Sequence, residues 1–353
     1  MPVDNYEPLV EVTRGEIVES IHYGAFCVVN SAGRLLAHAG NAELVTYPRS
    51  SMKPFQVLHF VEGGGVAYFG LSGEEIAIMC GSHAGTALHT SVLEGLHKKI
   101  GITEADLECG VHWPYDLETR QAMKLAGQTP TQLNHNCSGK HTGMLGLAQM
   151  RGFPTQSYID PHHPVQVNIR ATLGEMFEME PEEMRLGIDG CSVPVYGITM
   201  RKMAKAVAKM ADPVGLGAKR EAACRLITSA MATYPVMVAG PGQFDTDLMT
   251  AAGGKVFSKG GAEGYQVLGV TPDAITDGSP GIGIAIKISD GDVRGRARTS
   301  VALTILEKMG VLDPRENTLL EAYGNIPVKN WREFVVGQIQ PAFSFPDITG
   351  LAA

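Results

Sequence analysis

The chain has 353 residues, of which 44% are hydrophobic and 19% charged, and its formal net charge at pH 7 is −8. This length and composition suit a globular protein with a sizeable core. The acidic balance, without a clustered Lys/Arg stripe, argues against nucleic acid or an anionic membrane as a partner. No apolar run reaches the ~20 residues of a membrane span, and a secretory signal pattern is missing. We therefore expect a cytoplasmic protein.

Six cysteines, at positions 27, 80, 109, 137, 191 and 224, are not expected to form a disulfide framework in a cytosolic chain of this size. Cys27, Cys109 and Cys224 fit buried thiols that pack as small hydrophobic side chains. Cys137 and Cys191 lie in the polar, glycine-rich stretches NHNCSGKHTG and GIDGCSVP, and they need a separate explanation.

Strand patterns dominate the first forty residues. The stretches VEVTRG, EIVESIHYGAFCVVN and RLLAHAG alternate or run apolar, with turn signals between them. We predict an antiparallel meander here.

Helical patterns begin at Ser50. Pro54 belongs in the first turn of a helix, and Ser72 with Glu75 has the spacing of a capping box. An apolar stripe from Ala87 ends before Gly101. Further helices are predicted over 116–126, 139–151, 164–179, 197–211 and 217–233.

The C-terminal part returns to strands. KVFSKGGAEGYQVLGV predicts two strands, and GIGIAIKIS predicts another before a helix over 297–309. Strands at both chain ends predict a single α+β domain over residues 1–353. Its antiparallel sheet, with helices on its faces, would come from about 8–50 and 255–310, with an inserted helical lobe over about 51–250. No G-x-G-x-x-G follows a strand, which weakens a dinucleotide-binding interpretation.

Ser50-x-x-Lys53 is the first candidate for chemistry. Residues i and i+3 share a helix face, so the Lys53 amine can reach the Ser50 hydroxyl. At a helix N-terminus, developing negative charge is favoured. The motif is weak by itself, because a capping serine gives the same pattern.

Two later segments are also candidates. Ser82, in CGSHAG, follows a capped helix, although a simple loop serine is the alternative. Lys259, in SKGGAEG, ends a strand beside glycines that allow close approach of a substrate, or it protects a sheet edge. This order of motifs matches serine β-lactamases and penicillin-binding proteins, but S-D-N is missing and K-G-G replaces K-T-G.

Together, YPRSSMKPFQ, CGSHAG, NHNCSGKHTGML, GIDGCSVP and KGGAEG closely resemble the L-asparaginase II family, the rhizobial-type or class 3 asparaginases. The resemblance covers nearly the whole chain. It implies hydrolysis of L-asparagine to aspartate and ammonia, in asparagine catabolism, by a homodimer. It also implies a fold similar to serine β-lactamases and glutaminases. The T-G-G-T signature of the better-known asparaginase classes is not present.

The resemblance implies two Ser-Lys tandems, Ser50/Lys53 and Ser82/Lys259. Lowering a lysine pKa from about 10.4 to about 7 takes roughly 4–5 kcal/mol, which desolvation and a second cation can supply. A neutral lysine could take the serine proton and return it to departing ammonia. We favour Ser50 as the nucleophile and Ser82 as a proton relay or water-orienting group, while the sequence leaves this choice open.

The resemblance also implies one zinc ion per subunit on Cys137, Lys140 and Cys191. Two thiolates suit zinc, and a lysine ligand must be neutral, so binding should weaken as the pH falls. By residue type alone, His135 or His141 would be the commoner third ligand. The family pattern overrides that choice and leaves His141 as a neighbouring group or a histidine with no special role.

Arg49 and Asp189 are the best-placed candidates for the α-carboxylate and α-ammonium of asparagine, although ordinary surface or structural charges would look the same. The alternatives to an asparaginase are a glutaminase or a β-lactam or peptide amide hydrolase on the same fold. A non-catalytic, zinc-dependent amino-acid-binding protein is a further alternative.

Overall fold

The computed structural model describes residues 5–348, which divide into two compact units. Unit 1 holds the described residues up to Ser51, Ile198–Asp212, and the described residues from Asp247 onward. Unit 2 holds Met52–Gly197 and Pro213–Thr246. Over the described residues, none of the helices combines the length and the apolar character needed to cross a membrane.

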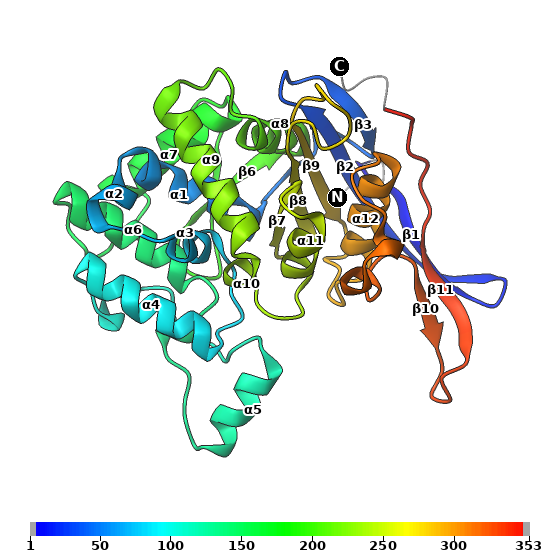
Figure 1. Ribbon diagram of the computed structural model, residues 1–353, viewed down its shortest axis with the longest axis horizontal. Coiled ribbons are helices and arrows are strands. Elements are labelled where there is room, and N and C mark those ends of the chain that lie inside the picture. Colours follow the sequence, from blue (N-terminus) through cyan, green and yellow to red (C-terminus); the bar gives the residue numbers. More distant parts are fainter. Residues whose placement is uncertain (1–4, 349–353) are drawn as a thin grey trace. The chain divides into compact units, whose positions relative to one another are not determined.

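An antiparallel sheet forms the centre of unit 1 (Figure 1), and its strands come from both ends of the chain. The strand order is β10-β11-β1-β2-β9-β8-β7, and β3 pairs with β2 off this path. The bounds are β1 Glu7–Arg14, β2 Ile17–Asn30, β3 Leu35–Ala39, β7 Val256–Gly261, β8 Tyr265–Val270, β9 Ile282–Ile288, β10 Ile326–Lys329 and β11 Val335–Pro341. The predicted α+β class with an antiparallel sheet from both chain ends is confirmed, as is the N-terminal meander. The β10–β11 hairpin lies beyond the predicted sheet region.

Every residue of β9 is buried, as expected for a strand covered on both faces. Two helices pack against it, α8 (Met200–Ala211) and α12 (Ala297–Lys308). The helix predicted over 197–211 is therefore present, but it belongs to the sheet unit and not to the helical lobe. An open hollow of about 460 Å³ lies beside α12, and none of the predicted site residues lines it.

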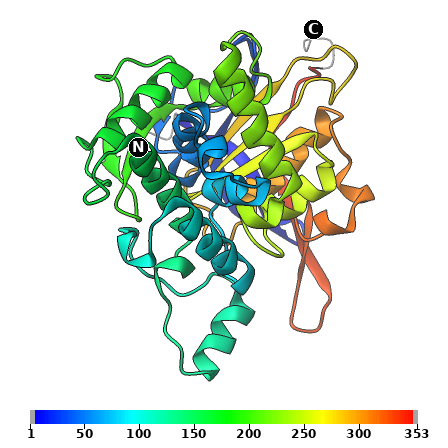
Figure 2. The ribbon, with the colours of Figure 1, turned by 60° about the vertical axis from the view of Figure 1, so that its left-hand side comes forward.

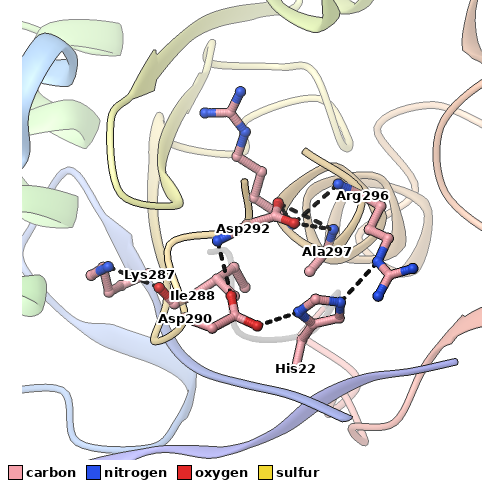
Figure 3. A network of polar contacts seen from close by, with 8 residues as sticks. His22, Lys287, Ile288, Asp290, Asp292, Arg296 and Ala297 are labelled. Atoms are coloured by element: carbon pink, nitrogen blue, oxygen red, sulfur yellow. Dashed lines mark hydrogen bonds and ion pairs between the residues drawn. The ribbon is translucent and has the colours of Figure 1, made fainter. Parts of the chain in front are cut away.

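A polar network ties β2 to the segment between β9 and α12 (Figure 3). Arg296 Nε donates to His22 Nε2 at 3.0 Å, and His22 Nδ1 lies 2.6 Å from Asp290 Oδ2. Because Nε2 accepts, Nδ1 carries the ring hydrogen and donates to the carboxylate. The Asp292 carboxylate accepts from three consecutive backbone N–H groups beginning with that of Arg296. These bonds satisfy donors that the start of a helix leaves unpaired.

Unit 2 is mainly helical, and α6 is buried from Ser138 to Ala148. It packs against α1, α3, α4 and α7. The bounds in unit 2 are α1 Lys53–Glu62, α2 Gly65–Phe69, α3 Gly73–Cys80, α4 Ala87–Ile100, α5 Leu117–Leu125, α6 Ser138–Arg151, α7 Pro164–Phe177, α9 Ala218–Thr233, α10 Pro235–Val238 and β5 Arg185–Ile188. Three further elements touch a unit boundary or lie near it: β4 Val45–Thr46, β6 Pro194–Thr199 and α11 Phe244–Ala252.

The predicted helices of unit 2 are confirmed to within a few residues. The capping box at the start of α3 is also present, since Glu75 N donates to Ser72 Oγ at 3.3 Å and Ser72 N donates to Glu75 Oε2 at 2.7 Å. Helix α5 has no buried residue, and in Figures 1 and 2 it stands apart from the other helices of unit 2.

Candidate functional site

The Ser50 motif lies in a 3-10 turn, η2 (Arg49–Met52), directly before α1. Ser50 is half-buried, and Ser51 Oγ donates to the backbone oxygen of Lys259 at 2.8 Å. The N-cap of α1 is Met52, without a side-chain hydrogen bond, so neither serine caps this helix. Unit 1 thus brings Ser51 and the SKGG segment together, although Ser51 and Lys259 are 208 residues apart.

The second glycine of the KGG motif, Gly261, lies where there is no room for a side chain. A Cβ at this position would lie 2.3 Å from Pro48 O and 3.0 Å from Ser51 Oγ. Any side chain would therefore push the η2 turn away from β7. Lys259 is buried on β7, and its Nζ donates to Gly260 O at 2.7 Å.

Lys53 is the first residue of α1 and is fully buried. Its Nζ lies 2.6 Å from Gly81 O, 2.8 Å from Ser82 Oγ and 3.2 Å from Asn136 O. Burial lowers the pKa of Lys53 below its usual value. A neutral amine can give its two N–H groups to the two carbonyls, which leaves its lone pair for the Ser82 hydroxyl. This arrangement suits a general base.

The loop that carries Ser82 is held by hydrogen bonds. Ser82 N donates to Val238 O at 2.7 Å. In the next residue, Nδ1 of His83 accepts from Gly85 N, so Nε2 carries the hydrogen and donates to Ser138 Oγ at 2.8 Å. Burial lowers the pKa of His83 well below its ordinary value, and the ring is neutral at pH 7. This neutral ring fixes the backbone beside Ser82.

The sequence paired Lys53 with Ser50 and Lys259 with Ser82, whereas the direct contact in unit 2 is between Lys53 and Ser82. These two residues are 29 positions apart and meet because α1 packs against α3. No local pattern in the sequence predicts that α1 packs against α3.

Cys137, Lys140 and Cys191 also lie together in unit 2 and are almost fully buried. Lys140 Nζ donates to Cys191 Sγ at 2.9 Å, and the two cysteine side chains hydrogen-bond one another. That sulfur–sulfur hydrogen bond holds the pKa of Cys137 well below its ordinary value. Burial alone would lower the pKa of Lys140, but the charges on Cys191 and Cys137 outweigh it and raise the pKa.

The surrounding motifs explain how these three residues are positioned. A Cβ on Gly139 would lie 2.2 Å from Ile78 O, so this glycine lets the start of α6 approach α3. Cys191 sits in the tight turn between β5 and β6, where Asp189 N donates to Val193 O at 2.9 Å. The Asp189 charge also helps to raise the pKa of Lys140.

The donor types of this cluster fit a zinc ion, because two thiolates are good zinc ligands and a neutral amine is a nitrogen donor. In the part of the chain that the structure describes, no three His, Cys, Asp or Glu side chains are placed to hold a metal ion. Neither His135 nor His141 therefore joins the two cysteines as a third ligand. A metal bound here would take Lys140 as its third protein ligand.

Arg49 and Asp189, the two substrate-binding candidates, belong to units 1 and 2 respectively. Arg49 has a φ of +53°, a conformation that is unfavourable for a residue with a Cβ. Such strain is often found where a site demands it. Asp189 is half-buried beside the cysteine cluster.

Sequence reasoning missed several supporting residues. His112 Nε2 accepts from Asn136 N at 3.0 Å, and its Nδ1 donates to Trp113 O at 2.7 Å. The His112 ring also packs against that of His135 in a tilted arrangement, with centroids 4.3 Å apart and an angle of 49° between the ring planes. These contacts fix the Asn136 carbonyl that accepts from Lys53. The histidines close to Asn136 were the only feature of the sequence that pointed to these supporting residues.

The comparisons with known proteins agree with the motifs. The sequence model of a family described as L-asparaginase II matches residues 10–341. No curated protein sequence matched the chain.

Three solved structures show the range of structural similarity. Mglu is 13% identical with a TM-score of 0.42, over 82% of this chain and 68% of its own. A Bacillus subtilis glutaminase in a covalent complex with 5-oxo-L-norleucine is 13% identical with a TM-score of 0.37, over 81% and 86%. A Bacillus glutaminase in 4.3 M NaCl is 13% identical with a TM-score of 0.38, over 82% and 91%. Since these TM-scores are below 0.5, the fold class rests on the sheet topology described above.

Proposed function

Because the chain belongs to the L-asparaginase II family, we propose that this amidohydrolase converts L-asparagine to L-aspartate and ammonia. The observation that carries the proposal is the contact between the buried Lys53 amine and the Ser82 hydroxyl. Amide hydrolysis needs an activated hydroxyl and a base. The two carbonyls that accept from Lys53 support its role as that base.

We propose that Ser50 is the nucleophile. Its hydroxyl oxygen forms a bond to the carboxamide carbon as its proton passes to neutral Lys53. Ser82 relays this proton to the nitrogen of the breaking C–N bond, and ammonia leaves. Water then attacks the aspartyl ester on Ser50, one of the protons of that water passes to the Ser50 oxygen as the ester C–O bond breaks, and aspartate is released. The hydrogen bond between Lys53 and Ser82 supports the relay.

Lys259, Arg49 and Asp189 take supporting roles in this proposal. Lys259 completes the second Ser-Lys tandem of the family pattern. Arg49 binds the α-carboxylate of asparagine, and Asp189 binds its α-ammonium. These roles rest on the family resemblance and on charge complementarity with a zwitterionic amino acid.

Cys137, Lys140 and Cys191 hold one zinc ion per subunit in this proposal, supported by their proximity and burial. Bound zinc supplies positive charge that neutralises the two thiolates and orders the segments carrying them. We also assign the protein to the cytoplasm as a homodimer. All six cysteines are free thiols, which supports a reducing compartment, while the dimer rests on the resemblance alone.

The test is ammonia release from asparagine by the purified wild type and by Ser50→Ala and Ser82→Ala. We expect turnover by the wild type, loss of activity in Ser50→Ala, and a fall of about 10²–10⁴-fold in Ser82→Ala. Nitrocefin hydrolysis in place of asparagine turnover would point to a β-lactam hydrolase. Binding of asparagine without turnover in the wild type would point to a binding protein, and either result contradicts the proposal.

A further inference from the structure

A chain of hydrogen bonds leads from the backbone to His141. The Tyr158 hydroxyl accepts from Glu108 N at 2.8 Å and lies 2.6 Å from His141 Nδ1. The hydroxyl accepts from Glu108 N, and among residues 5–348 its own hydrogen has no acceptor other than Nδ1, so we assign that hydrogen to Nδ1. The hydrogen of the neutral imidazole ring is consequently on Nε2.

This Nε2–H group is buried without an acceptor in full hydrogen-bond geometry among residues 5–348. An unsatisfied buried donor costs about 1–3 kcal/mol, so it needs an explanation. Nδ1 is occupied by Tyr158, and the nearby side chain that can accept from the ring is that of Cys191. The donor is thus directed at the cysteine cluster.

The position of His141 on α6 matches this direction. The residue directly before it, Lys140, donates to the same sulfur of Cys191 at 2.9 Å. With the ring hydrogen on Nε2, His141 has no lone pair to offer a metal at that atom. It can instead donate to a thiolate sulfur, which keeps lone pairs available after it binds a metal.

We propose that His141 is a positioning residue for Cys191, and that its Nε2–H donates to the Cys191 sulfur when that sulfur binds a metal ion. The inference rests on the proposed metal site. Groups that hydrogen-bond to metal ligands orient those ligands and typically change metal affinity by about 10–100-fold when removed. Metal binding keeps the Cys191 sulfur in its thiolate form, and this thiolate is the acceptor that the buried Nε2–H group lacks.

The experiment loads the full-length protein with Co²⁺, whose thiolate charge-transfer absorption reports on the sulfur ligands. His141→Leu removes the donor, whereas His141→Gln keeps an N–H group near the position of Nε2. We expect His141→Leu to bind Co²⁺ about 10–100-fold more weakly in competition with a chelator. Its charge-transfer band should move to longer wavelength, since an N–H donor stabilises the sulfur lone pairs. His141→Gln should restore both properties in large part.

His97→Gln is the matched control, because His97 is another buried histidine of unit 2 and bonds to Thr142 Oγ1 at 2.9 Å. It should leave the band unchanged. If His141→Leu does not fold, Tyr158→Phe takes its place: it keeps the ring but removes the hydroxyl that places the hydrogen on Nε2. A shifted band and weaker binding in Tyr158→Phe support the proposal.

Wild-type affinity and an unchanged band in folded His141→Leu, or in Tyr158→Phe where that variant replaces it, would overturn the role of His141 while the metal site stands. If the wild type takes up no Co²⁺ or Zn²⁺, or if Cys191→Ser binds them equally well, the metal site itself is wrong and this inference falls with it. Ammonia release by that same metal-free protein would still support the amidohydrolase proposal.

Discussion

Lys53 Nζ lies 2.8 Å from Ser82 Oγ, and both groups are carried by elements of the same unit. We predict that Lys53→Met lowers kcat for asparagine by about 10³-fold or more, because the base is lost. Lys53→Arg should not restore activity, since a guanidinium stays charged at neutral pH. The measurement is the steady-state rate, with circular dichroism to confirm folding. A kcat close to that of the wild type in folded Lys53→Met would remove the lysine from the mechanism.

We predict that the free energy of unfolding depends on pH, and His89 is one of the residues responsible. Its Nδ1 accepts from Thr86 N at 3.2 Å, and its Nε2 donates to Val236 O at 2.9 Å. Burial lowers the pKa of His89 in the folded protein, so only the unfolded chain gains the proton near pH 6.5. The resulting stability is complete above that pH and is lost as the pH falls toward the folded pKa.

Other buried histidines add to this effect in the same direction. Burial also lowers the pKa of His135 and His141, each to about 4. We therefore expect the free energy of unfolding, measured with urea, to fall between about pH 6.5 and pH 4. His89→Gln should reduce that slope, because glutamine can accept from Thr86 N without titrating. An identical slope in His89→Gln would show that His89 is not one of the responsible groups.

Asp292 should stabilise unit 1 through the start of α12. Its carboxylate accepts from the backbone N–H groups of Arg296, Ala297 and Arg298, and its φ is +44°. We predict that Asp292→Ala lowers the free energy of unfolding by about 1–2 kcal/mol. Asp292→Asn should lose less, since asparagine keeps an acceptor and tolerates this backbone conformation. Equal stability of the alanine variant and the wild type in urea titrations would count against this role.

Gly139→Ala should destabilise unit 2 and weaken metal binding. The added Cβ would lie 2.2 Å from Ile78 O, so the first turn of α6 must shift together with Lys140. We expect a loss of about 1–3 kcal/mol in urea unfolding, together with lower Co²⁺ affinity.

Gly95→Ala is the control, because the added Cβ on α4 meets no atom within 4 Å. It should raise stability by about 0.5–1 kcal/mol. If the two variants behave alike, close packing of α6 on α3 is not the reason for Gly139.

The local parts of the fold were predictable from the sequence. The capping box at Ser72 and the helix start at Pro54 depend on neighbouring residues only, and both are present. The β10 strand was missed because Pro327 obscures its pattern. A proline fits there because β10 is at one end of the strand order. The unit that α8 joins could not be deduced, since an amphipathic helix pattern reveals a buried face but not its partner.

The candidate site was predictable as a set of residues but not as a set of contacts. The motifs named Lys53, Ser82 and the cysteine cluster, whereas the hydrogen bond between Lys53 and Ser82 depends on helix packing. The hydroxyl of Ser51, the second serine of the SSMK motif, joins η2 to β7, and local spacing does not reveal that contact. The tautomers of His83 and His141 depend on groups distant in sequence, so no local spacing could reveal them.

The most direct test of the central claim is the initial rate of ammonia release from L-asparagine and from L-glutamine by the purified protein. The two substrates should be compared at equal concentration, with aspartate measured alongside ammonia. We predict equal molar amounts of aspartate and ammonia from asparagine, at a rate at least about tenfold above that with glutamine. Absence of ammonia release from asparagine, or faster release from glutamine, would contradict the account.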